Sequence, residues 1–430
     1  MPPVSVHLSG SGPAGAGGRQ PAAAGAAWIV IAAGVCAALH LGKLAPAIAV
    51  LQRDLGLTLV EAGFLLGLVQ GAGMTLGLLV GAWCDGLGAR RSLMFGLLLQ
   101  GAASAGGALV SGAGPMLALR AVEGLGFLMV VLPAPGLLRA LTPPERLRGM
   151  LGTWGAFMPV AVALALLAGP PVIELAGWRA WWVALAGVSV AMALTLRCTV
   201  PAQAAPAAAQ REPAASGPGQ ADAELRTLGR RVALTLRAPG PWFVALTFAV
   251  YSSQWLAVVG FLPTIVAQTG TGPLLGGFVA AGVAAANIVG NAASGHLLQR
   301  GVSAPVLLAT GFTTMAAGAV LGFAPLLDPG SAGRLFALGL FSAVGGLIPG
   351  TLFALAVQVA PHERAVSSTI GWMQQWSAAG QVLGPPAVAW VASAAGGWQR
   401  TWLATGACCV LGLALAAGLA RWQARPRAPR

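Results

Sequence analysis

Long apolar runs alternate with short polar segments along nearly the whole chain. A helix that spans a bilayer needs about 20 consecutive apolar residues, and we find twelve runs of that kind. They lie near residues 26–51, 59–83, 92–112, 115–139, 149–172 and 178–198, and then near 241–267, 273–298, 303–326, 333–359, 365–394 and 398–422. The pattern predicts an all-α membrane protein with 12 transmembrane helices.

A long polar stretch at residues 201–240 divides these runs into two sets of six. We therefore expect an N-terminal six-helix bundle at 26–200, a linker loop at 201–240 and a C-terminal six-helix bundle at 241–422. Residues 1–25 are rich in Gly, Ala, Pro and Ser and predict a disordered tail, and residues 423–430 are a short basic tail. The first apolar run is too long for a signal peptide, so we expect no cleavage.

Landmark residues recur at a nearly constant offset between the two sets. Pro46 is matched 217 residues later by Pro263. Four further pairs lie 218 residues apart: Pro143 and Pro361, Glu145 and Glu363, Arg146 and Arg364, Trp154 and Trp372. Such pairs indicate duplication. With six spans in each half, the repeats are parallel and related by a pseudo-two-fold axis along the membrane normal.

Composition supports lipid as the main solvent of this chain. Hydrophobic residues make up 57% of it and charged residues only 8%, with a mean hydropathy of +0.79, whereas soluble domains carry about 25% charged residues. The net charge of +13 would suggest nucleic acid in a soluble protein. Because most basic residues lie in short loops between apolar runs, we expect a lipid bilayer and no nucleic acid as partner.

The distribution of Lys and Arg predicts the orientation in the membrane, because cytoplasmic loops are enriched in these residues. Most of the 24 basic residues fall on one side if both termini are cytoplasmic. The opposite side then holds only Arg53, Arg179, Arg334 and Arg400. We expect a multi-pass protein of the cell inner membrane with both termini in the cytoplasm.

The turn after the second run carries the sequence Gly81-Ala82-Trp83-Cys84-Asp85-Gly86-Leu87-Gly88-Ala89-Arg90-Arg91. It resembles the GxLxDxxGxR[RK] signature of the major facilitator superfamily, with Trp83 at a position where Leu is usual. The resemblance extends over all twelve spans and implies a monomeric secondary transporter of small molecules. It also implies a conformational latch on the cytoplasmic side, formed by Gly81, Asp85, Gly88, Arg90 and Arg91. The alternative is a solvated loop that only sets topology.

Ionisable residues inside the runs are the sharpest functional signal, because each costs at least about 2.5–3.5 kcal/mol at a helix centre. His40 and Lys43 share a face of the first run, and Arg120 and Glu123 share a face of the fourth. The segment from Arg120 to Gly126 resembles the RxxxGxG motif of the family's fourth helix, whose Arg is linked to proton coupling.

We therefore expect Glu123, paired with Arg120, to be the proton-responsive group. We expect His40, Lys43 and Arg120 to contact the substrate. Three alternatives stay open: Lys43 extends to the membrane surface, the Arg120–Glu123 pair is purely structural, and His40 is a core histidine. Glu61 is better explained as an interfacial residue or a helix-start charge.

Aromatic and amide side chains within the runs add further candidates, since polar amides facing lipid are unfavourable. We expect Trp154, Gln254, Trp372 and Gln375 to contact the substrate, with the repeat-related Trp154 and Trp372 facing one another across a cavity. A second group of tryptophans is predicted at the membrane interface: Trp178, Trp182, Trp398 and Trp402.

Two cations, Lys43 and Arg120, against one intramembrane acid, Glu123, favour a small anionic or strongly polar substrate. The segments GKLAPAIAVLQRDLGLTLVEAGFL, RAVEGLGF and LPAPGLLRAL resemble the cyanate-porter-like branch of the superfamily. We predict alternating-access transport coupled to protons. The alternative is proton-driven efflux of a drug-like compound or metabolite, although the GxxxGPxxGG stretch common in efflux pumps is absent from the fifth run.

Other function classes have little support in the sequence. A membrane-embedded enzyme needs clustered His, Asp or Glu, and the four histidines are scattered over the tail, helices and a loop. The five cysteines show no CxxC pair and no spacing typical of a zinc site. We expect no enzymatic activity, no metal and no cofactor.

Overall fold

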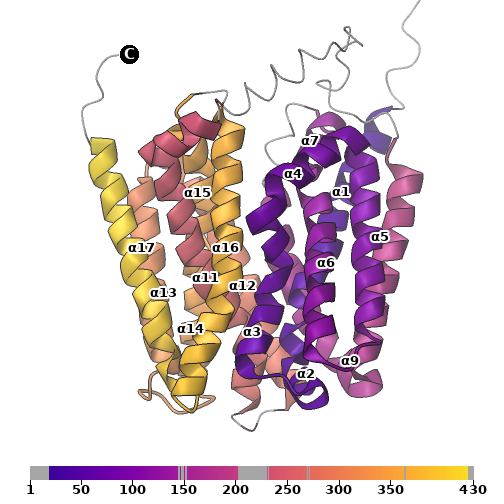
Figure 1. The fold of residues 1–430 in the computed structure, drawn as a ribbon. Coiled ribbons are helices and arrows are strands. Elements are labelled where there is room, and N and C mark those ends of the chain that lie inside the picture. The colour runs from indigo at the N-terminus through magenta and orange to yellow at the C-terminus, as the bar shows by residue number, and fades with distance from the viewer. Residues whose placement is uncertain are drawn as a thin grey trace, which may run out of the picture.

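The computed structural model describes residues 19–143, 146, 150, 153–201, 230, 232–268, 270, 272–362 and 365–424, and these form only helices and connecting turns. The helices gather in two bundles that stand side by side (Figure 1). One bundle runs from α1 to α9 and the other from α11 to α17. The predicted all-α membrane fold with two helical halves is confirmed.

The N-terminal half contains several short helices between the long ones. Its elements are α1 (Arg19–Gly42), η1 (Ala45–Ala47), α2 (Ile48–Leu55), α3 (Leu59–Gly67), η2 (Leu68–Gln70), α4 (Gly71–Leu87), α5 (Ala89–Gly107), α6 (Ala113–Val131), α7 (Ala134–Leu141) and α9 (Phe157–Thr199). Because α1 begins at Arg19, residues 19–25 are helical and do not belong to the predicted tail. Residues 1–18 lie outside the described part of the chain.

The C-terminal half follows the same plan with longer uninterrupted helices. Its elements are α11 (Pro239–Ala267), α12 (Pro273–Gln299), α13 (Ala304–Phe323), α14 (Ala332–Gly345), α15 (Leu347–Val359), α16 (Val366–Ala394), η4 (Trp398–Arg400) and α17 (Thr401–Ala424). Most of the predicted linker falls on residues 202–229 and 231, which lie outside the described residues.

The helices are consistent with twelve membrane crossings. Within the described ranges, nine helical stretches are long and apolar enough to cross a membrane. One of them, α9, has 43 residues and holds two predicted spans, because Gly177 with φ 80° and ψ 165° interrupts the helical backbone. The remaining two predicted spans are α5 and α16.

The two arms of α9 lie against the same stretch of α1. A Cβ on Gly42 would come within 2.9 Å of the Ala165 side chain, which belongs to the first arm. The carbonyl of the next residue, Lys43, accepts a hydrogen bond from Trp181 Nε1 in the second arm (3.2 Å). Gly177 therefore joins two neighbouring antiparallel helices, as the two predicted spans require.

Several spans change helix type or direction within their length. In the first span, Pro46 occupies a 3₁₀ turn between α1 and α2, and Ala47 N–H donates to Leu44 O (2.8 Å). In the second span, η2 separates α3 from α4. At the start of α3, Thr58 and Glu61 form a reciprocal capping box, which confirms Glu61 as a helix-start charge.

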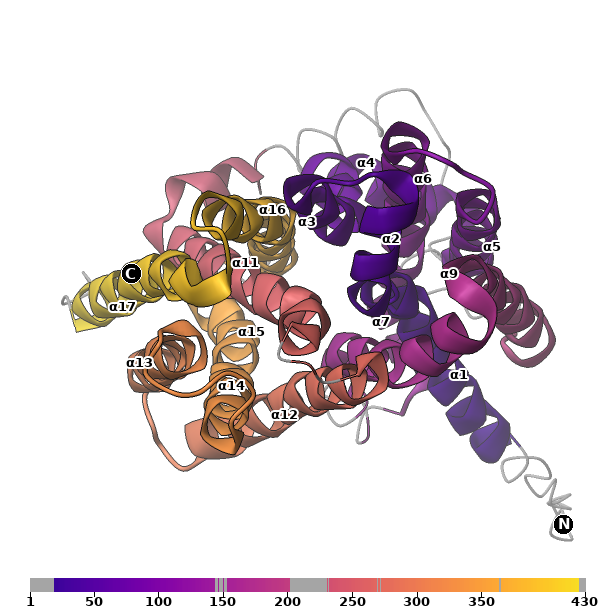
Figure 2. The ribbon, with the colours of Figure 1, turned by 90° about the horizontal axis from the view of Figure 1, so that it is seen from below.

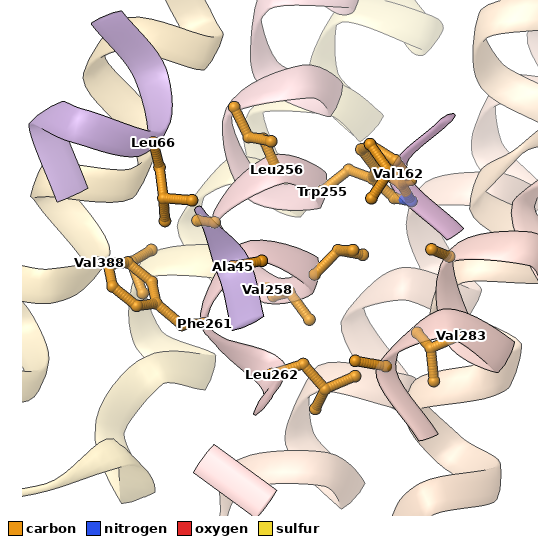
Figure 3. Packing of buried hydrophobic residues seen from close by; sticks show 14 of the residues in the cluster. Ala45, Leu66, Val162, Trp255, Leu256, Val258, Phe261, Leu262, Val283 and Val388 are labelled. Atoms are coloured by element: carbon orange, nitrogen blue, oxygen red, sulfur yellow. The ribbon is translucent and has the colours of Figure 1, made fainter. Parts of the chain in front are cut away.

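The two halves, seen from below in Figure 2, touch along η1, α3, η2, α4 and α9 on one side and α11, α12 and α16 on the other. A Cβ on Gly63 would lie 2.7 Å from Pro386 Cα, and a Cβ on Gly277 would lie 2.3 Å from the ring of Pro170. Figure 3 shows that Leu66 belongs to the same apolar cluster as residues of α11. Glycines and prolines thus allow close backbone approach between the halves.

Candidate functional site

His40, Lys43, Arg120 and Glu123 meet in one cluster inside the N-terminal half. The Glu123 carboxylate lies between two cations: Lys43 Nζ donates to Oε1 and Arg120 Nη1 donates to Oε2. His40 Nδ1 lies 3.8 Å from Glu123 Oε1. The side chains are at most 1% exposed. The two faces predicted on the first and fourth spans therefore pack against each other.

Side chains of α5 and α9 complete the surroundings of Lys43. Its Nζ donates to Ser104 Oγ (2.8 Å) and to His40 Nδ1 (3.4 Å) and lies 4.6 Å from the centre of the Trp182 ring. Ser104 Oγ in turn donates to the Trp182 carbonyl (2.8 Å). His40 Nε2 lies 2.8 Å from Ser189 Oγ. Lys43 is thus held by four helices of one half.

Arg120 connects the acid to two interrupted spans. Its Nη1 also donates to the His40 carbonyl near the end of α1 (2.7 Å), and its Nε donates to the Leu65 carbonyl near the end of α3 (3.2 Å). Its Nη2 is buried and has no hydrogen-bond partner in the described part of the chain. Hence Arg120 couples Glu123 to the backbone of α3, the helix that packs on the opposite half.

The position of Lys43 excludes one alternative and shows which helices surround the cluster. Lys43 does not extend to the membrane surface, because its ammonium group is buried and bonded to Glu123 and Ser104. Its contacts, like those of Arg120 and Glu123, come from α1, α3, α5, α6 and α9, all of which belong to the N-terminal half. The physical reason is that two buried cations require an acid, and Glu123 lies in their own half.

The two predicted cavity tryptophans pack within their own halves. The Trp154 ring stacks on Phe157 with centroids 4.5 Å apart and fills the space left by Gly34, where a Cβ would lie 2.4 Å from Trp154 Cζ3. The Trp372 ring meets Trp242 edge-on at 5.0 Å. Trp372 Nε1 is buried without a partner among the described residues. The expected pairing of Trp154 with Trp372 across a cavity is therefore wrong for this conformation.

The two predicted glutamines differ in position. Gln254 is buried and its Oε1 accepts from Cys409 Sγ of α17 (3.3 Å), inside the C-terminal half. Gln375 donates through Nε2 to the Met74 carbonyl of α4 (2.7 Å), and so it lies where the halves meet. The sequence reasoning missed a neighbouring contact, Gln70 Nε2 to Gln381 Oε1 (3.1 Å), which also joins the halves.

The predicted latch segment lies at the turn between α4 and α5. Gly88 has φ 82° and ψ 140°, a conformation that favours glycine. Arg90 Nη2 donates to the Arg197 carbonyl at the end of α9 (2.7 Å), and Arg91 is exposed. Gly81 and Asp85 lie in α4, but their surroundings fall outside what the structure describes.

Some members of the cluster could not be selected from the sequence. Ser104 and Ser189 are single serines within apolar helices and carry no motif. Trp182 was predicted at the membrane interface, which is wrong: it is fully buried, and its ring lies beside the Lys43 ammonium. Trp178 is also buried and donates from Nε1 to Asp54 Oδ2 (2.8 Å).

Two hollows lie at the end of the molecule where α3 begins and α11 ends. The larger has a volume of about 450 Å³ and is lined by Ala49, Gln52, Arg53, Thr264, Ala267 and Gln268. These residues come from both halves, yet the His40–Glu123 cluster does not contribute to it. Among the described residues, no three His, Cys, Asp or Glu side chains are placed to hold a metal ion.

Solved structures with a similar fold support this architecture. A bacterial homolog of the human lysosomal transporter Spinster, inward-facing and unoccupied, gives a TM-score of 0.76 at 14% identity, over 94% of this chain and 98% of that one. The xylose transporter XylE from E. coli, in a partially occluded inward open conformation, gives 0.71 at 15% identity, over 94% and 98%. At such identities the likeness concerns the fold alone.

Sequence comparison gives the family. An uncharacterized MFS-type transporter of Mycobacterium tuberculosis is 31% identical over 113 residues, which are 26% of this chain and only 19% of that protein. The model of the Major Facilitator Superfamily matches residues 30–377, most of the chain. With the two six-span halves and the turn at Gly88 already described, this match shows that the chain belongs to the major facilitator superfamily of membrane transporters.

Proposed function

We propose that this protein is a secondary active transporter that moves a small polar, anionic solute across the membrane and couples that movement to protons. The buried cluster of Lys43, Arg120 and Glu123 carries the proposal. A charged residue inside a membrane is expensive and marks ion pathways and proton relays. With His40 neutral, two cations face one acid, so the cluster has an excess positive charge that favours an anion nearby.

The cluster that holds Glu123 and Arg120 is the proposed centre of proton coupling. Arg120 holds the Leu65 carbonyl, and Leu65 lies between Gly63 and Gly67, which pack on α16 of the other half. A change in the charge state of the cluster therefore acts on the helix that forms the boundary between the halves. This connection gives the cluster a physical route to influence which side is closed.

Alternating access then follows from the arrangement of the halves. The described close contacts between them gather toward the end where α3 begins and α11 ends, including Gly63 with Pro386 and Gly260 with Leu66. Rocking of one bundle against the other is the usual motion of such repeats. Gln375 lies at the boundary and is the proposed direct contact to the solute, with Lys43, His40 and Arg120 acting when the N-terminal half loosens.

Other parts of the proposal rest on the sequence. The excess of Lys and Arg supports both termini in the cytoplasm of an inner-membrane protein. The turn from Gly81 to Arg91 is the proposed latch of the cytoplasmic side. The segments around Lys43 and Glu123 support a place in the cyanate-porter-like branch, and the superfamily match supports a monomeric transporter.

The test is uptake by proteoliposomes that contain the purified protein and an imposed pH gradient. Radiolabelled acetate, lactate and other small carboxylates serve as probes beside neutral sugars. We expect gradient-driven uptake of a carboxylate, and its loss in Glu123→Gln and Arg120→Ala. Glu174→Gln, an exposed acid of the same half, is the matched control and retains uptake.

Two outcomes of the uptake assay would contradict the proposal. Full gradient-driven uptake in both Glu123→Gln and Arg120→Ala removes the coupling role of the pair. An inward proton gradient that drives solute out of the vesicles favours the efflux alternative.

A further inference from the structure

We propose that Lys43, and not Glu123, carries the proton that this cluster gains and loses. The inference rests on the proposed function and deepens it by naming the atom, Lys43 Nζ, on which the coupled proton travels. Three observations support it: the charge balance of the cluster, the hydrogen-bond partners of Glu123, and the hydrogen-bond partners of Lys43.

The charge balance leaves one cation without a partner acid. Glu123 is the only Asp or Glu bonded to the cluster in the described part of the chain. Arg120 stays charged, since a guanidinium does not lose its proton in proteins. One acid therefore offsets Arg120, and Lys43 is the group whose deprotonation brings the buried cluster to neutrality. Lysine is also the basic residue that changes its protonation readily when buried.

The partners of Glu123 oppose its protonation. A protonated carboxyl group must donate its hydrogen to an acceptor. Its two oxygens instead receive hydrogen bonds from Lys43 Nζ and Arg120 Nη1, and ammonium and guanidinium groups have no acceptor. His40 Nδ1, at 3.8 Å from Oε1, is beyond hydrogen-bond distance. Glu123 is thus built to remain a carboxylate.

The partners of Lys43 accommodate both of its states. As an ammonium it donates three hydrogen bonds, to Glu123, Ser104 and His40 Nδ1, and His40 Nε2–H donates to Ser189 Oγ. As an amine it keeps two donors for Glu123 and Ser104, and its lone pair accepts from His40 Nδ1–H. His40 Nε2 then accepts from the Ser189 hydroxyl. Each state satisfies the same contacts, with His40 in one tautomer or the other.

One proton leaves in this exchange. The Nζ proton passes to His40 Nδ1, and the proton on Nε2 passes to Ser189 Oγ. Ser189 is buried in this conformation, so its original hydroxyl hydrogen passes to water when the N-terminal half loosens. Ser189 Oγ lies 3.8 Å from Cys36 Sγ, and Cys36 and His40 precede Lys43 along α1. The relay therefore leads from Lys43 toward the end of the bundle at which α1 begins.

The helices packed around Lys43 contribute few other groups. They are His40 and Cys36 from α1, Ser104 from α5, Arg120 and Glu123 from α6, and Ser189 and Trp182 from α9. The Trp182 ring, 4.6 Å from Nζ, and Glu123 stabilise the ammonium. Arg120 and burial oppose it. Because these influences have opposite signs, both protonation states of Lys43 are accessible.

The sequence offers a direct test, because Lys43 is the only lysine in the protein. Lysine labelled with ¹³Cε and ¹⁵Nζ therefore gives one side-chain signal in the full-length protein in lipid nanodiscs. We expect that signal to shift from the ammonium to the amine position as the pH is raised over the range where the protein stays folded. In glutamate-labelled protein, the Glu123 carboxyl signal, assigned by its loss in Glu123→Gln, stays at the carboxylate position.

A second lysine provides the reference. Arg53→Lys introduces an exposed lysine in α2, whose signal reports the titration of a free lysine in the same sample. Ser189→Ala removes the relay partner of His40, and we expect slower proton exchange at Lys43 Nζ. If proton exchange at Lys43 Nζ is as fast in Ser189→Ala as in the wild type, the relay through His40 and Ser189 is wrong.

The inference is overturned if Lys43 keeps the ammonium position across the pH range while the Glu123 carboxyl signal moves. The measurement needs neither substrate nor gradient. A permanently charged Lys43 therefore refutes this inference even where uptake is proton-driven, and uptake without proton coupling refutes the proposed function whatever the signal shows.

Discussion

Replacing Gly67 by Ala should open the contact between the halves. A Cβ at this position would lie 2.3 Å from the Gln381 carbonyl oxygen and 2.8 Å from Val382 Cα, both backbone atoms of α16. Alanine favours a helix by about 0.5–1 kcal/mol over glycine, whereas overpacking costs about 1–3 kcal/mol. The free energy that favours contact between the halves is then smaller by about 1–2 kcal/mol, which lowers the ratio of closed to open molecules by about 5- to 30-fold.

Spin labels at Arg53 and Gln268 can measure this change. These exposed residues line one hollow from opposite halves, and the native cysteines are first replaced. We expect double electron–electron resonance to show longer label distances in Gly67→Ala. Gly71→Ala is the matched control, because the nearest atom to its Cβ is a flexible Leu68 carbon at 3.4 Å.

The result that would refute this reasoning is a distance distribution in Gly67→Ala equal to those of the wild type and Gly71→Ala. Lower thermal stability without a change in distance would place the overpacking cost in the bundle itself, and the proposed effect on closure would then be wrong.

Two further predictions concern thermal stability, read from tryptophan fluorescence in detergent. Glu123→Gln leaves Lys43 and Arg120 buried without their acid and should lower the free energy of unfolding by about 3–5 kcal/mol. Lys43→Met keeps the balanced Arg120–Glu123 pair and should lower it clearly less. Equal losses in the two variants would contradict the proposed charge balance of the cluster. Gly177→Ala forces alanine to φ 80° and should lower the free energy of unfolding by about 1–3 kcal/mol. Gly187 is exposed within a helix and has open space around its Cβ, so Gly187→Ala should stabilise the protein. Equal shifts in melting temperature would show that Gly177→Ala introduces no backbone strain.

Much of the fold could be predicted from the sequence because lipid imposes a simple rule. Apolar runs of about 20 residues become helices that cross the membrane, and a duplicated set of them becomes two related bundles. The helical period also placed His40 beside Lys43 and Arg120 beside Glu123, since residues three apart share a face. Local chemistry was equally readable at Thr58 and Glu61, where the capping box formed as a helix start requires.

The tertiary structure alone decided what those faces meet. Lys43 and Glu123 are 80 residues apart, and no periodicity within one helix tells which neighbour it packs against. The packing of α1, α5, α6 and α9 placed Ser104 and Trp182 beside Lys43 and Ser189 beside His40, and so the cluster lies inside the N-terminal half. Buried charges require nearby partners, and long-range packing supplies them, so the sequence determined which residues carry the chemistry and the fold determined where it takes place.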